Sequence, residues 1–229
     1  MAIPRLSDPK EYTYISPSGS PFVKIVDGDI FDVKMQYPLM NLKSSVSDCF
    51  VREEVFDMLV KAQKYLPEGI KFRIWDTWRP FSLQAELYYF YSESIIRTFN
   101  LEGKSESEQK KLISKFVSYP KNNTLVPPVH TTGGAVDLTL IDLEGKELQM
   151  GTEFDSFSEK TKTDYFENST YNNIKENRRI LYNAMIKAGF TNLPSEWWHY
   201  DYGDRFWAYY NNEPAIYEGI FALEDLYTK

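Results

Sequence analysis

Cysteine and histidine are scarce in this chain, whose 229 residues include one cysteine and two histidines. The single thiol, Cys49, excludes an internal disulfide framework and a zinc site built from several thiolates. Basic residues are outnumbered, because 26 Lys and Arg stand against 33 Asp and Glu and give a net charge of -7. No basic stripe is available to neutralise phosphates, so nucleic acid is not an expected partner.

Long apolar runs are also missing. No stretch approaches the roughly 20 apolar residues of a membrane-spanning helix, and residues 1–9 hold no apolar run of signal-peptide length. A cytoplasmic enzyme that needs no membrane is the simplest interpretation. An exported mature form whose signal has been removed is the alternative that the sequence leaves open. Heptad repeats are absent too, and no obligate protein partner is evident.

Aromatic residues are abundant at 16%, with 17 Tyr and 5 Trp, which favours clefts lined by rings. The length suits a single domain over residues 1–229 with a sizeable core. Predicted helices and strands come in separate runs with few βαβ alternations. We therefore expect an α+β fold with a central, mainly antiparallel sheet, flanking helices and a cleft for the active site.

Hydrophobic periodicity predicts the individual elements. An apolar stripe at helical spacing runs over residues 48–66, and residues 70–75 alternate as in a half-buried strand. Capping residues define three further helices. These are a helix over 83–98 capped by Ser82, a helix from Ser105 to near residue 120 opened by a capping box, and a helix over 173–188 ended by Gly189. Strands are expected over 135–141 and near 195–201.

The two histidines lie in segments that suit a metal site. His130 precedes a Gly-rich turn, and Asp137 follows within an apolar strand, where a carboxylate is costly to bury unless it is paired or bound to a metal. His199 follows Glu196 by three residues. Two imidazoles and one carboxylate can hold zinc with its fourth position open to water, and Glu196 can take a proton from that water. A salt-bridged aspartate and two core histidines are the alternative interpretation.

Arg79 is the third notable feature. It lies between Trp78 and Pro80, directly after the predicted strand. Its rigid guanidinium can stabilise the oxyanion of a tetrahedral intermediate. Stacking on Trp78 or an ion pair with Asp76 explains the same residues equally well.

Several blocks of the chain resemble the D-alanyl-D-alanine dipeptidases of the vancomycin-resistance type, which are zinc peptidases. The blocks keep their order over residues 70–200. They are Trp75-Asp76-Thr77-Trp78-Arg79-Pro80, residues 130–140 (HTTGGAVDLTL), Met150-Gly151-Thr152-Glu153-Phe154-Asp155, Asn177-Arg178-Arg179, and Gly189-Phe190 leading to Glu196-Trp197-Trp198-His199-Tyr200.

The resemblance implies roles for the matching positions. It implies one Zn²⁺ per chain, with zinc ligands His130, Asp137 and His199, the general base Glu196, and the oxyanion donor Arg79. It also implies that Asp155 receives the free ammonium of a small dipeptide, with Tyr37 and Asp76 as further substrate-binding residues.

Two departures from the family pattern concern the substrate. Pro128 stands where the family usually has a serine two residues before the first zinc histidine, and Thr131-Thr132-Gly133-Gly134 replaces a more polar sequence. The expected activity is zinc-dependent hydrolysis of D-Ala-D-Ala or a closely related dipeptide. The alternatives are a carboxypeptidase or endopeptidase acting on peptidoglycan stem peptides, and a metal-bearing binding protein without catalysis.

Overall fold

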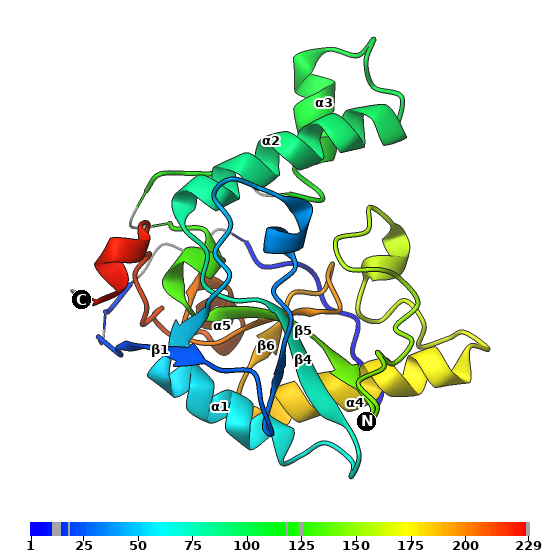
Figure 1. Cartoon of the computed structure of the whole chain (residues 1–229). Helices are drawn as coiled ribbons and strands as arrows, with labels where there is room; N and C mark the ends of the chain where they lie inside the picture. The colour runs from blue at the N-terminus through cyan, green and yellow to red at the C-terminus, as the bar shows by residue number, and fades with distance from the viewer. Residues whose placement is uncertain (11–14, 18, 118, 124–125, 228–229) are drawn as a thin grey trace.

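The computed structural model describes residues 1–10, 15–17, 19–117, 119–123 and 126–227, and its α+β fold is organised around a five-stranded sheet (Figure 1). The strand order is β2 (Asp32–Val33), β4 (Lys71–Asp76), β5 (Ala135–Ile141), β7 (His199–Asp201) and β6 (Thr191–Asn192). Only the β2–β4 pair is parallel, and the other three pairs are antiparallel. The prediction of a mainly antiparallel sheet is confirmed. A separate antiparallel pair joins β1 (Phe22–Ile25) to β3 (Cys49–Arg52).

Helices flank this sheet. In Figure 1, α1 (Glu53–Gln63) and α4 (Asn172–Ala188) lie beneath the sheet, whereas α2 (Phe81–Thr98) and α3 (Glu106–Ile113) extend from the opposite side. A fifth helix, α5 (Arg205–Asn211), follows β7. The described residues also form four short 3₁₀ helices: η1 (Tyr37–Met40), η2 (Val129–Thr132), η3 (Glu159–Thr161) and η4 (Leu223–Tyr227). Within the described part of the chain, no helix is long and apolar enough to cross a membrane.

The main core joins α1 and α4 to the sheet. Leu59 of α1, Leu138 of β5 and Leu181 of α4 are all fully buried in one cluster. Leu59 belongs to the apolar stripe that the sequence predicts over residues 48–66, and burial of the apolar faces of α1 and α4 fixes both helices against one face of the sheet. The polar residues of β5 alternate with the apolar ones and point to the other face.

Some predicted boundaries were wrong. The helix predicted over 48–66 begins only at Glu53, because residues 49–52 form β3 and pair with β1. Ser82 does not cap α2, which begins at Phe81 with Pro80 at the N-cap position. The capping box at Ser105 is confirmed, although α3 ends at Ile113. The strand predicted near 195–201 shortens to His199–Asp201.

Candidate active site

Strand register brings two aspartates and one histidine, from three neighbouring strands, side by side. Asp137 on β5 lies opposite Asp76 on β4 and opposite His199 on β7. Directly opposed residues of antiparallel strands point to the same face of the sheet. A register shift between Ile74 and Asp76 brings Asp76, rather than Trp75, opposite Asp137. Such irregularities re-aim side chains beside functional sites.

His130 reaches this row from η2. The helix is closed by Gly133, whose φ of 74° lies in the left-handed region. A Cβ at Gly133 would lie 2.3 Å from Cε1 of Phe22, so only glycine fits the turn. The tight turn returns the chain directly into β5. The turn therefore brings His130 close to Asp137 in space.

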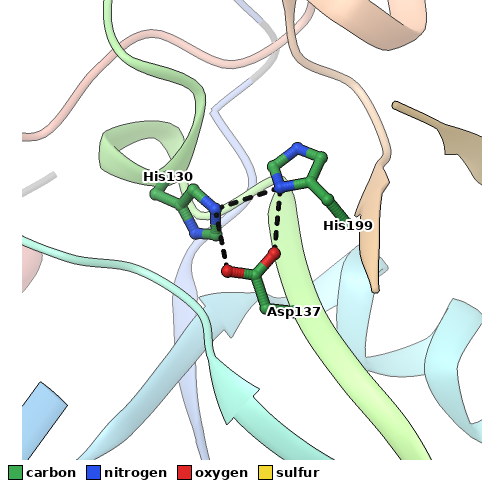
Figure 2. A group of neighbouring side chains, drawn as sticks. All are labelled: His130, Asp137 and His199. Atoms are coloured by element: carbon green, nitrogen blue, oxygen red, sulfur yellow. Dashed lines mark hydrogen bonds and ion pairs between the residues drawn. The ribbon is translucent and has the colours of Figure 1, made fainter. Parts of the chain in front are cut away.

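His130, Asp137 and His199 converge in the structure (Figure 2). Nε2 of His130 lies 3.2 Å from Nδ1 of His199 and 3.5 Å from Oδ2 of Asp137. Nδ1 of His199 lies 2.9 Å from Oδ1 of Asp137. All three residues are buried, with at most 3% of their surface exposed.

The outer nitrogen of each imidazole is held by an acceptor. Nδ1 of His130 donates to the carbonyl oxygen of Thr77 at 2.8 Å, and Nε2 of His199 donates to Oδ1 of Asp201 at 2.8 Å. With these protons fixed, the lone pairs of the remaining nitrogens can face each other and the Asp137 carboxylate. Outer hydrogen bonds of this kind orient the histidine ligands of metal sites.

The donor set fits a zinc ion. Zinc–nitrogen and zinc–oxygen bonds near 2.0–2.1 Å at tetrahedral angles place two ligand atoms about 3.3 Å apart. The three observed separations, 3.2, 3.5 and 2.9 Å, scatter around that value. Two imidazoles and a carboxylate also leave one tetrahedral position for water or substrate.

The charges around the two imidazoles shift their pKa values in opposite directions. Burial lowers the pKa of His130, and the positive charges of Arg79 and His199 act in the same direction. Burial also lowers the pKa of His199, but Asp201 and Asp137 outweigh it and the net shift is upward. A group bound between Asp137 and His199 is thus stabilised when it is positive.

Glu196 lies beside these three residues, in the turn before β7. Its backbone N–H donates to Leu193 at 2.9 Å, and His199 closes the turn by donating to the Glu196 carbonyl at 3.4 Å. Oε2 of Glu196 lies 4.0 Å from Nδ1 of His199, and 27% of the side chain is exposed to the cleft. Burial raises the pKa of Glu196 to about 8. A carboxyl group that titrates near neutral pH can both accept and return a proton.

Arg79 is held in one orientation by three side chains. Its Nη1 lies 3.1 Å from Oδ2 of Asp76 and donates to Tyr37 Oη at 3.0 Å, while Nε donates to Gln84 at 3.0 Å. Trp78 points away, with its Nε1 donating to the carbonyl of Ile220. Of the two structural alternatives for Arg79, the ion pair with Asp76 is present. Arg79 nevertheless lines the cleft and is available to a substrate oxygen.

Asp76 lies behind the cleft wall and is 1% exposed. Its Oδ2 is 3.1 Å from Arg79 and 3.2 Å from Nδ1 of His130. Asp76 thus contacts both Arg79 and His130. The substrate contact expected for Asp76 stays a prediction.

Asp155 lies at the far side of Arg79. It adopts a φ of 54°, which aspartate tolerates better than most residues. Its Oδ2 accepts hydrogen bonds from Tyr37 at 3.0 Å and from Tyr91 at 2.7 Å. The family resemblance named Tyr37 and Asp155 as substrate-binding residues, but no motif marks Tyr91.

A cleft of about 610 Å³ joins these groups. Its walls include the three candidate ligands, Glu196, Arg79 and Asp155. Pro128 also lines the cleft, at the position where a serine was expected from the family pattern. Arg205 and Phe206 of α5 line it too, so the aromatic tail after β7 reaches the site. Asp201, which the sequence did not single out, is fully buried behind His199.

The cleft thus has the composition of a metal-dependent hydrolase, and comparison with known proteins identifies the family. The profile described as D-ala-D-ala dipeptidase matches residues 40–216. The chain belongs to this peptidase family.

Two relatives named D-alanyl-D-alanine dipeptidase give the scale of the similarity. The protein of Synechocystis sp. is 32% identical over 154 residues, which cover 61% of this chain and 62% of the relative. The protein of Enterococcus faecium is 30% identical over 152 residues, which cover 64% of this chain and 70% of the relative. The match to the Synechocystis protein thus spans less than two thirds of that protein's length.

Proposed function

We propose that this protein is a zinc dipeptidase that hydrolyses D-Ala-D-Ala or a closely related dipeptide, as a single domain holding one Zn²⁺. The observation that carries the proposal is the convergence of His130, Asp137 and His199 at ligand spacing beside Glu196. Membership of the D-ala-D-ala dipeptidase family supports the reaction class. The names of the relatives support the choice of dipeptide.

His130, Asp137 and His199 hold the metal in this proposal. When bound there, zinc supplies Lewis acidity, which lowers the pKa of water to about 7. Glu196 accepts a proton from the attacking water, because its carboxylate faces the cleft beside the three proposed ligands. The same carboxyl returns that proton to the leaving amine.

Arg79 stabilises the negative charge that develops on the scissile carbonyl oxygen. Its guanidinium is already oriented by Asp76, Gln84 and Tyr37, so little reorganisation is required during the reaction. Preorganised donors of this kind contribute about 3–4 kcal/mol to transition-state stabilisation.

Asp155 selects for a free amino terminus. Asp155 lines the cleft. The hydroxyl of Tyr37 forms hydrogen bonds with both Asp155 and Arg79, so these two side chains lie close together. An ammonium bound by Asp155 therefore lies close to the scissile bond, which suits a dipeptide. A stem-peptide carboxypeptidase or endopeptidase has no use for an acidic residue at this point.

Two substrates separate the alternatives. Purified protein with zinc is expected to release alanine from D-Ala-D-Ala and to leave an N-acylated tripeptide ending in D-Ala-D-Ala intact. Cleavage of the acylated tripeptide at a comparable rate would support the stem-peptide enzyme. Turnover of neither, with one zinc bound per chain, would support the binding protein.

Glu196→Gln supplies the matched test of mechanism. The substitution keeps the shape of the side chain and removes its ability to accept a proton. Turnover is expected to fall below detection while zinc content, measured by mass spectrometry of the metal, stays at one per chain. Near-normal turnover in this variant would overturn the assigned role of Glu196.

A further inference from the structure

The two oxygens of the Asp155 carboxylate differ in their hydrogen-bond partners. Oδ2 accepts two hydroxyl hydrogen bonds, from Tyr37 of η1 and from Tyr91 of α2. The bond from Tyr91 is the shorter, at 2.7 Å against 3.0 Å. Hydroxyl donors to an ionised carboxylate form short, strong bonds, and the observed length is in that range. Oδ2 is thus committed to the protein. No group of the described residues forms a hydrogen bond with Oδ1, which remains for a ligand in the cleft.

Tyr91 lies on α2, and contacts with neighbouring side chains fix its ring. Its ring makes an edge contact with Phe157 at 5.4 Å, and its hydroxyl also approaches Sδ of Met40 at 3.8 Å. Phe157 contacts Phe116 at 5.5 Å, and Phe116 stacks on Phe99 at 5.5 Å. This series of rings connects the end of α2 to the loop that carries Asp155.

We propose that Tyr91 is a positioning residue for amino-end recognition: its hydroxyl fixes Asp155 so that Oδ1 accepts the ammonium of an unblocked dipeptide. The inference rests on the proposed function and deepens it. Within the described part of the chain, Tyr91 contacts neither the proposed metal ligands nor Glu196, so it acts on substrate binding through Asp155.

The electrostatics of Asp155 agree with this geometry. Burial and then the charge of Asp137 raise the pKa of Asp155 to about 6. The hydrogen bond from Tyr91, the charge of Arg79 and the hydrogen bond from Tyr37 oppose that rise. The two hydroxyls thus help to keep the carboxyl ionised, which is the form that attracts an ammonium.

Tyr91→Phe tests the proposal because it removes one oxygen and keeps the ring against Phe157. KM for D-Ala-D-Ala should rise about 5- to 20-fold with little change in kcat, since one hydrogen bond to a charged group is lost. The matched control is Tyr88→Phe, which removes the same atom from the same helix. Tyr88 contacts the rings of Tyr89 and Tyr119 and does not line the cleft, so KM should stay unchanged.

The N-acetyl derivative of D-Ala-D-Ala distinguishes a positioning role from a general loss of structure. It lacks the ammonium, so its KM should be equal in wild type and Tyr91→Phe. If it is not turned over, its inhibition constant replaces KM. Equal weakening of both peptides would overturn the proposal, as would an unchanged KM for the free dipeptide.

A double-mutant cycle with Asp155→Asn tests whether Tyr91 acts through Asp155. Tyr91→Phe should then raise KM no further, because the charged partner is already absent. If the double variant raised KM by the product of the two separate increases, Tyr91 and Asp155 would act independently and the proposal would be contradicted. The wild-type assay separates this result from failure of the proposed function. A wild type that hydrolyses no dipeptide refutes the function, whereas active wild type with unaltered selectivity in Tyr91→Phe refutes the role of Tyr91 alone.

Discussion

Replacing Asp201 with asparagine tests how the protein prepares His199 to bind a metal. Oδ1 of Asp201 accepts the Nε2 proton of His199 at 2.8 Å, and Asp201 is fully buried. The neighbouring Asp204 is also fully buried, and burial together with Asp201 raises the pKa of Asp204. The contact with Asp201 raises the pKa of His199, so the imidazole becomes a more basic ligand at Nδ1.

The asparagine side chain has nearly the same shape but lacks the charge. If its oxygen faces Nε2, the tautomer of His199 is kept and the imidazole becomes a weaker ligand. If its NH₂ group faces Nε2, the proton must move to Nδ1, where it blocks the metal. Loss of such an outer partner weakens metal binding about 10- to 100-fold, or about 1.4–2.8 kcal/mol.

Competition with a chromophoric zinc chelator at neutral pH measures the affinity. Asp57→Asn is the matched control, because Asp57 is exposed on α1 and undergoes the same chemical change. Zinc affinity should fall for Asp201→Asn and stay constant for Asp57→Asn. Equal affinity in wild type and Asp201→Asn, with folding intact by circular dichroism, would refute the reasoning.

Three further predictions address the oxyanion donor, the sheet edge and the turn before β5. Arg79→Lys should lower kcat about 100- to 1000-fold in dipeptide assays while Tm is retained, because an ammonium cannot reproduce the guanidinium contacts; an unchanged kcat would contradict it. The hydrogen bond from Arg73 lowers the pKa of Asp32, so its stabilisation is present above the unfolded pKa of about 3.9 and is lost as pH falls through the lower folded value. The Tm difference between wild type and Asp32→Asn should therefore be constant from pH 7 to 5 and shrink toward pH 3; a difference that grows on acidification would contradict this. Gly133→Ala should destabilise by about 2–4 kcal/mol in urea unfolding, since the positive φ and the clash with Phe22 both oppose it; a loss below about 0.5 kcal/mol would show that the turn relaxes.

Elements that depend only on nearby residues in the sequence were predicted well. β5 matches its predicted range of 135–141, and α4 begins at Asn172, one residue before the prediction. The capping box at Ser105 is present because both of its hydrogen bonds are local. Residues 49–52 were assigned to a helix because their apolar pattern continues into α1, but pairing with β1, distant in sequence, makes them a strand.

The candidate ligands could be predicted from residue type and family resemblance, whereas their surroundings could not. His130, Asp137, His199 and Glu196 belong to recognisable motifs, and the structure brings them together. Contacts such as Tyr91 with Asp155, 64 residues away, depend on tertiary packing and leave no local signal.

Asp76 illustrates the same limit. It lies in a family motif, but its position beside Arg79 and His130 depends on the irregular register of β4, which the sequence does not reveal. Two-residue strands such as β2 and β6 are also too short to show periodicity.

Zinc titration of metal-free protein tests the central claim most directly. Protein treated with chelator and then dialysed is supplied with increasing Zn²⁺, and release of alanine from D-Ala-D-Ala is followed. No activity is expected at the start, followed by a linear rise that saturates at one zinc per chain. Full activity in the metal-free protein, or no activity with one zinc bound, would contradict it.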